Sequence, residues 1–333
     1  MKLATLSNGR PDGHLVVVSR DLAWCVSAGR IAPHLQAALD SWETSAPALQ
    51  KLADDLDDGQ VAAIPFDPSK ALAPLPRAYQ WIDGAAYLSH LERVRSLAGS
   101  KDAELQSERP LLYQGGSDAL TPSHGPIVVP DDTLGVDFEA ELAVIVGPVP
   151  MRPDKATAAA AIRLVTTCND VSLRRLVADD LHNGFGFFHA KPSTSFGPVV
   201  ATPDEFGVAW HDNKLHLRVE VEVNGKLFGR PDAGVDMHFD FADLIAAAAN
   251  TRTLGAGTII GSGTITNRHD ETPPIRKDGI GFACIAEARA VEKLKYGKAR
   301  TPFLKAGDRL RIVAIDAEGR PLLGAIDQRV QLL

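Results

Sequence analysis

The sequence predicts an α+β protein that is mainly β, in which a small N-terminal α+β domain (residues 1–75) precedes a larger domain (residues 76–333). Short apolar segments separated by Asn-Gly and Asp-Gly turns recur along the chain, and residues 215–223 alternate apolar and polar side chains before another Asn-Gly turn. This pattern is typical of β-hairpins. Prolines gather in residues 65–76, as expected of a segment between two domains.

The expected N-terminal domain has a pattern of its own. Residues 2–6, 14–19 and 22–27 are short apolar segments separated by turn sequences, and we expect each to be a strand. Residues 34–57 carry leucines at roughly helical spacing and are expected to be helical. No residue pattern typical of a catalytic or metal site occurs in this part of the sequence.

Length, charge and cysteine content exclude several classes of protein. The 333-residue chain has a net charge of −7 with dispersed Lys and Arg, whereas nucleic-acid binders present a basic patch. Its three cysteines are far apart and form no CxxC pair, so neither a disulfide framework nor a zinc knuckle is expected. The N-terminal residues show no signal-peptide pattern, and the apolar run near residues 241–249 is too short to span a bilayer. We therefore expect a cytoplasmic protein that binds neither nucleic acid nor membranes.

A strand with clustered carboxylates stands at the centre of the larger domain. In residues 136–147, VDFEAELAVIVG, strand alternation puts Asp137, Glu139 and Glu141 on one face, and the rest of the strand is apolar. An unpaired buried carboxylate costs on the order of several kcal/mol, so a positive charge is required, and a divalent cation is the simplest candidate. Pairing with Arg or Lys, or a solvated strand face, would also satisfy the pattern.

Three other segments carry residues suited to chemistry, each with a simpler alternative. Asp83 is placed to cap a helix-like run, and His90 lies two helical turns further on, although a surface histidine would give the same pattern. Residues 169–172, Asn-Asp-Val-Ser, fit turn and cap chemistry. Lys191 stands in an aromatic segment, where it either extends to solvent or faces an anion.

The secondary structure around these segments is expected to include helices over 155–167 and 241–250 and a strand over 285–288. The glycine-rich residues 255–266 contain neither a GxGxxG pattern nor the Gly-Lys-Ser/Thr of a phosphate loop. A nucleotide site is therefore not expected.

Taken in order, these motifs resemble the fumarylacetoacetate hydrolase family across roughly residues 77–333. The agreeing motifs are D-x-E-x-E-L at 137–142 in a strand ending in Val-Gly, Asn-Asp-x-Ser at 169–172, Lys191 before Phe196 and Pro198, Ser-Gly-Thr-Ile at 262–265, and Leu-Lys-x-Gly-Asp at 304–308. Each motif alone is weak. All five occur in the family's order, and Asp83 and His90 stand at the family's spacing, which makes the resemblance specific.

The resemblance implies a fold and a metal site. The implied fold is a fumarylacetoacetase-type mixed β-sandwich roll preceded by a small N-terminal domain, in a homodimer that binds a divalent cation (Mg²⁺, Mn²⁺ or Ca²⁺). The implied metal ligands are Asp83, Glu139, Glu141 and Asp170. A ligand set made only of oxygen suits a hard cation and disfavours Zn²⁺ or Cu²⁺.

The implied reaction is hydrolysis of a C–C bond in a 1,3-diketo acid, fumarylacetoacetate or an acylpyruvate, in aromatic catabolism such as tyrosine breakdown. His90 would be the general base, Glu287 the acid that orients it, and Lys191 the cation that stabilises the oxyanion. Glu92 is a rival for the orienting role. The positions that match substrate-contacting residues of the family are Tyr113, Arg174 and Thr264.

The sequence departs from true fumarylacetoacetases at positions that shape recognition of the substrate's carboxylates. Ala85 replaces a tyrosine, with Tyr87 nearby; Gly99 replaces an arginine, for which Arg93 or Arg95 could substitute; and Val177 replaces a glutamine. These changes bear on the identity of the substrate more than on the metal or the base.

Two alternatives to the hydrolase remain. Within the same family, relatives act as oxaloacetate-type decarboxylases, isomerases or 2-oxo-enoate hydratases, which use the same enolate-stabilising metal without an attacking water paired with a base. The second alternative is a catalytically silent metal-binding protein. Loss of a metal carboxylate would favour it, but all of the implied ligands are present.

Overall fold

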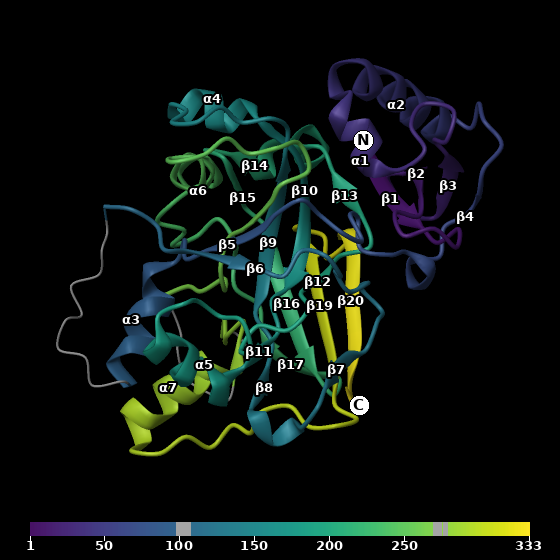
Figure 1. The fold of residues 1–333 in the computed structure, drawn as a ribbon. Coiled ribbons are helices and arrows are strands. Elements are labelled where there is room, and N and C mark those ends of the chain that lie inside the picture. The colour runs from purple at the N-terminus through teal and green to yellow at the C-terminus, as the bar shows by residue number, and fades with distance from the viewer. Residues whose placement is uncertain (98–107, 269–274, 276–278) are drawn as a thin grey trace.

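The computed structural model describes residues 1–97, 108–268, 275 and 279–333. Two sheets dominate it, and the helices lie around their edges and faces (Figure 1). This confirms the predicted α+β, mainly β class. In the part of the chain that the structure describes, no helix has the length and apolar character needed to cross a membrane.

The larger sheet has the strand order β4-β3-β2-β1-β13-β10-β9-β18-β5-β6, and β12 also pairs with β10. Its strands are β1 (Lys2–Leu6), β2 (His14–Val18), β3 (Trp24–Ser27), β4 (Ile64–Pro65), β5 (Trp81–Gly84), β6 (Leu112–Gly115), β9 (Ala140–Val146), β10 (Ile162–Asn169), β12 (Ser195–Phe196), β13 (Val200–Ala201) and β18 (Ile259–Gly261).

The second sheet has the order β17-β16-β19-β20-β7, and two short ladders join β8 to β11 and β14 to β15. These strands are β7 (Ile127–Val129), β8 (Val136–Asp137), β11 (Ser172–Leu173), β14 (Trp210–His211), β15 (Lys214–Leu215), β16 (Arg218–Val223), β17 (Lys226–Gly229), β19 (Arg309–Ile315) and β20 (Pro321–Leu332).

The helices gather in three places (Figure 1). Helices α1 and α2 lie over the N-terminal strands, α4 and α6 pack together beyond the far end of β9, and α3, α5 and α7 surround the opposite end. Their bounds are α1 (Leu35–Asp40), α2 (Trp42–Asp57), α3 (Leu88–Leu97), α4 (Lys155–Ala160), α5 (Arg174–Asn183), α6 (Phe241–Ala248) and α7 (Ile285–Tyr296), with 3₁₀ turns η1 (Pro68–Lys70), η2 (Asp132–Leu134) and η3 (Pro203–Ala209).

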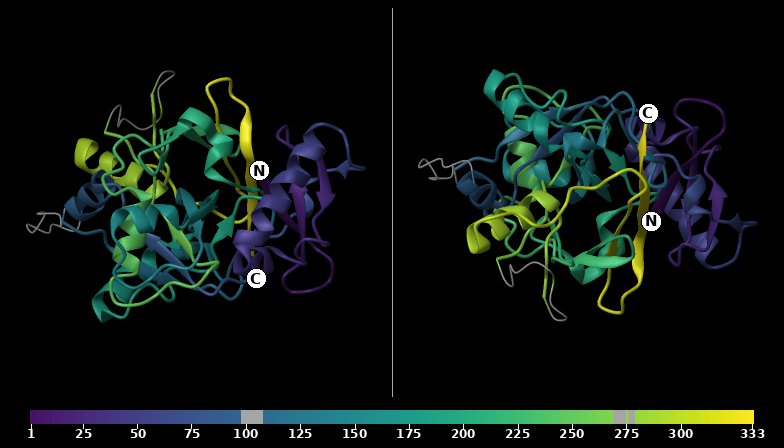
Figure 2. Two further views of the ribbon diagram at one scale, coloured as in Figure 1. Left: turned by 90° about the horizontal axis from the view of Figure 1, so that it is seen from above. Right: turned by 90° about the horizontal axis from the view of Figure 1, so that it is seen from below.

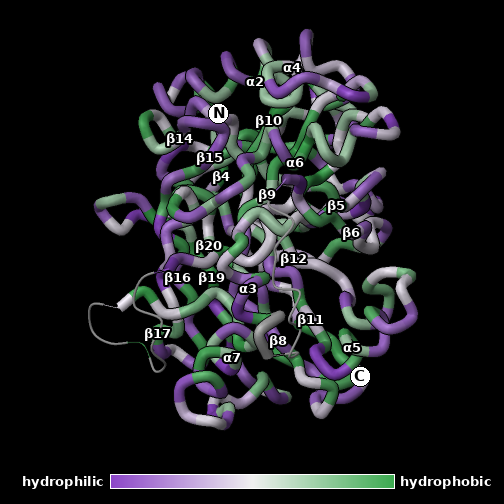
Figure 3. The backbone as a smooth tube through the Cα atoms, turned by 90° about the vertical axis from the view of Figure 1, so that its left-hand side faces the viewer, coloured by the Kyte–Doolittle hydropathy of each residue, from purple (hydrophilic) through white to green (hydrophobic). Residues whose placement is uncertain are grey.

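Strand β9 is buried on both faces because it lies between two hydrophobic cores. Leu142 and Val144 belong to the core shared with the second sheet. Ala143 and Ile145 belong to the core that is closed by the N-terminal helices. In Figure 3, hydrophobic residues accordingly run through the central strands, and hydrophilic residues lie on outer segments such as α2.

The N-terminal strands extend the larger sheet. Strand β1 pairs with β13, with Lys2 opposite Ala201 and Leu3 opposite Val200. Leu3 also shares one core with Trp81 and Ile145 of the larger domain. Figure 2 shows the N-terminal segment lying against the rest of the chain. The division of the chain at residue 75 stays a prediction, but its two sides share hydrogen bonds and apolar contacts.

The carboxylate strand is interrupted, which corrects the prediction of one continuous strand over residues 136–147. Strand β8 ends at Asp137 and pairs with β11, whereas β9 begins at Ala140 and pairs with β10. Phe138 and Glu139 fall between them. Asp137 is thereby directed to a different neighbourhood from that of Glu141.

Two other segments differ from expectation. The helix expected over 155–167 ends at Ala160, because the β-branched and apolar residues from Ile162 onward pair with β9. Residues 285–288 open helix α7 and are not a strand. The backbone amides of Ile285 and Ala286 donate to the buried Asp137 carboxylate, at 2.7 and 2.9 Å, and a carboxylate stabilises a helix N-terminus.

The shared core predicts that the whole chain unfolds together. We expect Leu3→Ala to lower the free energy of unfolding by about 2–5 kcal/mol because a fully buried side chain is truncated. Scanning calorimetry should show one transition, moved to lower temperature. The control is Val208→Ala at an exposed site, which should change stability by less than about 0.5 kcal/mol. Two transitions of which only one moves would contradict the shared core.

Candidate active site

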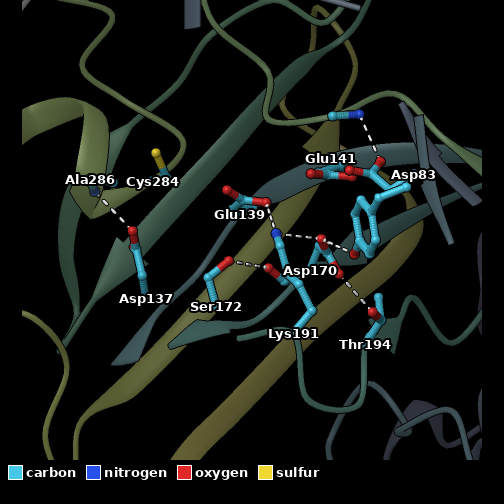
Figure 4. A network of polar contacts seen from close by, with 12 residues as sticks. Asp83, Asp137, Glu139, Glu141, Asp170, Ser172, Lys191, Thr194, Cys284 and Ala286 are labelled. Atoms are coloured by element: carbon cyan, nitrogen blue, oxygen red, sulfur yellow. Dashed lines mark hydrogen bonds and ion pairs between the residues drawn. The ribbon is translucent and has the colours of Figure 1, made fainter. Parts of the chain in front are cut away.

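Four buried carboxylates converge between α3, α5 and the central strands (Figure 4). Asp83, Glu139, Glu141 and Asp170 each place a carboxylate oxygen within 4.8 Å of the others. None of the four is more than 6% exposed. The structure therefore brings together all four residues that the sequence resemblance implied as metal ligands, in an acidic group able to bind a metal.

Neighbouring strands of the larger sheet hold these carboxylates at one end of the sheet. Strand β18 lies between β5 and β9, with Gly261 opposite Asp83 on one side and Ala143 on the other. A Cβ atom on Gly261 would lie 2.3 Å from Asp83 Oδ1, so only glycine leaves room for the carboxylate. Gly263 has a positive φ of 76° and donates its N–H to the same oxygen at 3.0 Å.

This placement corrects the expected role of Asp83. The residue lies within strand β5, and helix α3 begins only at Leu88, so Asp83 does not cap the helix. Strand and helix nevertheless bring Asp83 and His90 to the same cavity, which both residues line.

Two cations face the cluster from α5 and the segment after it. Lys191 Nζ lies 2.5 Å from Glu139 Oε2 and 2.6 Å from Asp170 Oδ2. Arg174 donates to Glu139 Oε1 at 2.6 Å and to Asp137 Oδ2 at 2.7 Å. Lys191 is therefore directed at anions and does not extend to solvent, and Asp137 pairs with Arg174 apart from the four-carboxylate cluster.

Burial and mutual repulsion perturb the pKa values of the cluster. Desolvation, reinforced by neighbouring carboxylates, raises the pKa of Asp83 to about 8. Burial and the nearby Asp83 also raise the pKa of Glu141 well above its usual value. Burial acts in the same direction on Glu139, but Lys191 and Arg174 hold the pKa of that carboxyl well below its usual range. Full ionisation of the cluster therefore requires additional positive charge.

The residues present fit a hard divalent cation. Glu141 Oε1 is buried and has no hydrogen-bond partner among the described residues. An unpaired buried acceptor is costly, and a metal ion would satisfy it. The donor set contains only carboxylate oxygens, which are the ligands that Mg²⁺, Mn²⁺ and Ca²⁺ prefer.

A histidine–carboxylate pair lies beside the cluster. His90 Nδ1 is 3.4 Å from Glu287 Oε2, and Glu287 is fully buried on α7. Burial acts to raise the pKa of Glu287, but the hydrogen bond from His90 and the charge of Arg93 lower it below its usual value. An ionised carboxylate in this position orients the imidazole and stabilises its protonated form.

The structure distinguishes between the two candidates for this partner. Glu92, on the same helix as His90, pairs with Arg268 at 2.7 and 3.0 Å. Glu287 is the carboxylate that contacts His90.

Sequence reasoning missed the groups that hold Glu287 and Asp170 in place. Arg93 donates hydrogen bonds to Glu287 Oε1, and Thr266 donates to the same oxygen at 2.5 Å. Thr194 donates to Asp170 Oδ1 at 2.7 Å. Arg93 stands three residues after His90 on a helix, a spacing that places both on one face and could have indicated the contact.

The predicted substrate-contacting residues line one cavity of about 270 Å³ together with the cluster and His90. Tyr113 donates to Asp170 Oδ2 at 2.6 Å, and its ring packs edge-on against Phe187. Thr264 is buried at the opposite side. Arg174 lines the cavity, but its polar atoms contact carboxylates of the protein.

The positions at which the sequence departs from fumarylacetoacetases fall around this cavity. Ala85 and Val177 line it. Tyr87 does not replace the missing tyrosine hydroxyl, because its own hydroxyl donates to the Ala233 carbonyl at 2.6 Å. Arg93 contacts Glu287 and so does not replace the missing arginine. Gly99 and the side chain of Arg95 lie outside the described part of the structure.

The raised pKa of Asp83 predicts how metal-free protein responds to pH. Because the native state holds this proton more tightly than the unfolded chain, its stabilising contribution is present below the ordinary value of 3.8 and is lost as pH rises through about 8. We expect metal-free Asp83→Asn to melt at a higher temperature than the wild type at pH 8–9, by a few degrees at about 2–4 °C per kcal/mol. The difference should shrink at pH 5, as thermal melts in chelator would measure.

The same variant should lose the stabilisation that added Mg²⁺ or Mn²⁺ gives the wild type, since a ligand that binds the native state raises its melting temperature. An Asp83→Asn protein that is less stable than the wild type without metal at pH 9, or that responds equally to metal, would contradict the electrostatic account of the cluster.

Comparison with known proteins agrees with this geometry. The family model described as fumarylacetoacetate hydrolase C-terminal matches residues 80–331, and that described as fumarylacetoacetase N-terminal domain 2 matches residues 1–77. The chain is 29% identical over 200 residues to the mitochondrial oxaloacetate tautomerase FAHD1 of Bos taurus, covering 58% of this chain and 85% of that protein. It is 30% identical over 200 residues to oxaloacetate tautomerase YisK of Bacillus subtilis, covering 59% and 62%.

Solved structures share the fold over the full length. Maleylpyruvate hydrolase from Sphingobium sp. SYK-6, in complex with manganese(II) and pyruvate, matches with a TM-score of 0.66 at 20% identity, over 100% of this chain and 99% of that chain. Fumarylacetoacetate hydrolase from Exiguobacterium antarcticum matches with a TM-score of 0.66 at 18% identity, over 100% of both chains. The fumarylacetoacetase-type fold is thus confirmed, and since the family model spans most of the sequence, the chain belongs to the fumarylacetoacetate hydrolase family.

Proposed function

We propose that this protein is a metal-dependent hydrolase that cleaves a C–C bond in a 1,3-diketo acid of the acylpyruvate or fumarylacetoacetate type. The observation that carries the proposal is the His90–Glu287 pair beside the four-carboxylate cluster, in one cavity. A hydrolase of this kind needs a base for water next to a site that stabilises an enolate. Relatives whose names include maleylpyruvate hydrolase and fumarylpyruvate hydrolase share the fold.

The reaction assigns a task to each residue. His90 accepts a proton from water as the water oxygen bonds to the acyl carbonyl carbon, and Glu287 stabilises the resulting imidazolium. Lys191 stabilises the oxyanion of the tetrahedral adduct. The C–C bond then breaks with its electron pair on the departing methylene carbon. Return of the proton from His90 yields a carboxylic acid and a 2-oxo acid.

A divalent cation completes this site. Asp83, Glu139, Glu141 and Asp170 would hold Mg²⁺, Mn²⁺ or Ca²⁺, and such an ion supplies Lewis-acid stabilisation of the negative charge on the enolate. The support from this chain is the all-oxygen donor set, the unpartnered Glu141 Oε1 and the raised pKa values of Asp83 and Glu141. The homodimer and the cytoplasmic location expected from the sequence stay predictions.

Oxaloacetate chemistry is the second candidate. Its support is the sequence similarity to two oxaloacetate tautomerases at 29% and 30% identity. Enolisation or decarboxylation of oxaloacetate needs the same stabilised enolate but no attacking water. Retention of such an activity after loss of His90 would favour this candidate.

Ultraviolet turnover assays with acylpyruvates, fumarylacetoacetate and oxaloacetate test the choice. We expect cleavage of at least one diketo acid with Mg²⁺ or Mn²⁺ and its loss in chelator, because enolate departure depends on the cation. Action on oxaloacetate alone would overturn the hydrolase and leave the metal site standing. Cleavage that is unaffected by chelator would overturn the metal site.

His90→Ala tests the base. We expect kcat/KM for diketo-acid hydrolysis to fall by about 10²–10⁴-fold, which is the range for loss of a general base, while bound metal measured by plasma emission stays at the wild-type level. Glu92→Gln on the same helix is the matched control and should change kcat/KM less than about twofold, since Glu92 pairs with Arg268. Wild-type hydrolysis by His90→Ala would remove this residue from the mechanism.

A further inference from the structure

The active-site cavity is charged at one end and apolar along its opposite wall. We propose that the hydrolase acts on 2,4-diketo acids whose acyl group is uncharged and apolar, an alkyl or aryl chain, in preference to diacids. This inference rests on the proposed function and specifies its substrate class.

The apolar wall is built by three segments that face the carboxylate cluster across the cavity. They are helix α3, strand β6 with the residue before it, and helix α5 with the segment that follows it. Their lining side chains are Leu91, Val94, Leu111, Val177, Leu181 and Phe187. An acyl group that extends away from the diketo-acid head therefore meets hydrocarbon on several sides.

Two of these side chains lie at the mouth of the cavity and are largely open to solvent. Leu181 is 61% exposed and Leu111 is 38% exposed. Apolar surface that is exposed beside a cavity gains most when a ligand covers it. An alkyl or aryl group would cover this surface, whereas a carboxylate would lose hydration without compensation.

Among the described residues that line the cavity, the permanently charged cations are Arg174 and Lys191. Both are engaged by the protein's own carboxylates. Arg174 contacts Asp137 and Glu139, and Lys191 contacts Glu139 and Asp170. Neither side chain lies on the apolar wall, so a second substrate carboxylate there would meet no described cation.

Arg93 is the buried cation nearest in sequence to this wall, and it is also engaged. It donates to Glu287, to Thr266 Oγ1 at 2.5 Å and to the Asn267 carbonyl at 3.1 Å. An unpaired charge that is transferred into apolar surroundings is strongly unfavourable. The wall therefore selects against an acyl group that ends in a carboxylate.

A substrate series tests the proposal with the metal-loaded protein. We would measure kcat/KM for acetyl-, hexanoyl-, benzoyl-, fumaryl- and maleylpyruvate. Each methylene that becomes fully buried is expected to raise kcat/KM by roughly fourfold, so hexanoylpyruvate should exceed acetylpyruvate by at least about tenfold. The fumaryl and maleyl diacids should fall at least about tenfold below hexanoylpyruvate. A diacid that equals or exceeds the apolar substrates would overturn the inference.

A charge placed on the wall should reverse the preference. Val177 is half-buried on α5, a helix without fully buried side chains, so Val177→Arg should leave the fold intact, as a thermal melt checks. We expect this variant to lower kcat/KM for hexanoylpyruvate and raise it for fumarylpyruvate, each by about tenfold. Val208→Arg, at an exposed position outside the cavity lining, is the matched control and should keep the wild-type ratio. An unchanged ratio in Val177→Arg would contradict the role of the wall.

The series also separates this inference from the proposed function. Cleavage of the diacids in preference to apolar substrates refutes the inference and keeps the hydrolase. If the metal-loaded protein cleaves no member of the series, the hydrolase is refuted, and calorimetric binding of the same compounds decides the inference. Tighter binding of hexanoylpyruvate than of fumarylpyruvate would support an apolar acyl site, and the opposite order would exclude it.

Discussion

The constraint on which the rest of this structure depends is the burial of four carboxylates in one small volume. Two cations, Lys191 and Arg174, face them, and Arg174 is shared with a further carboxylate, Asp137. Repulsion and desolvation within this group oppose folding, as the raised pKa values of Asp83 and Glu141 show. The fold tolerates this arrangement because large apolar cores adjoin it on both faces of the central strand.

Sheet geometry converts that constraint into a site. The carboxylates come from adjacent strands, and glycines at positions 261 and 263 leave the space and the N–H donor that Asp83 requires. The buried Asp137 carboxylate accepts from the first amides of α7, and that helix carries Glu287 toward His90. The metal cluster and the histidine pair are thus positioned through one set of polar contacts.

The sequence predicted what depends on local pattern and missed what depends on partners. Alternation predicted the buried strand that carries Glu139 and Glu141, and the motif order predicted the residues that meet in the cavity. Local composition favoured a helix continuing past Ala160 and a strand over 285–288, but pairing with β9 and the contact with Asp137 decide both segments. The partner of His90 comes from 197 positions away, so no local pattern could choose between Glu92 and Glu287.

The cavity separates three properties that a family of enolate-forming enzymes can vary independently. The carboxylate cluster stabilises the enolate, which hydrolases, isomerases and tautomerases all require. The His90–Glu287 pair adds a base for water, and it therefore favours hydrolysis over enolisation alone. The facing wall contacts neither the cluster nor the base, so a substitution such as Val177 can change the acyl group accepted without altering the chemistry. This separation explains why relatives with one fold carry names for different reactions and substrates.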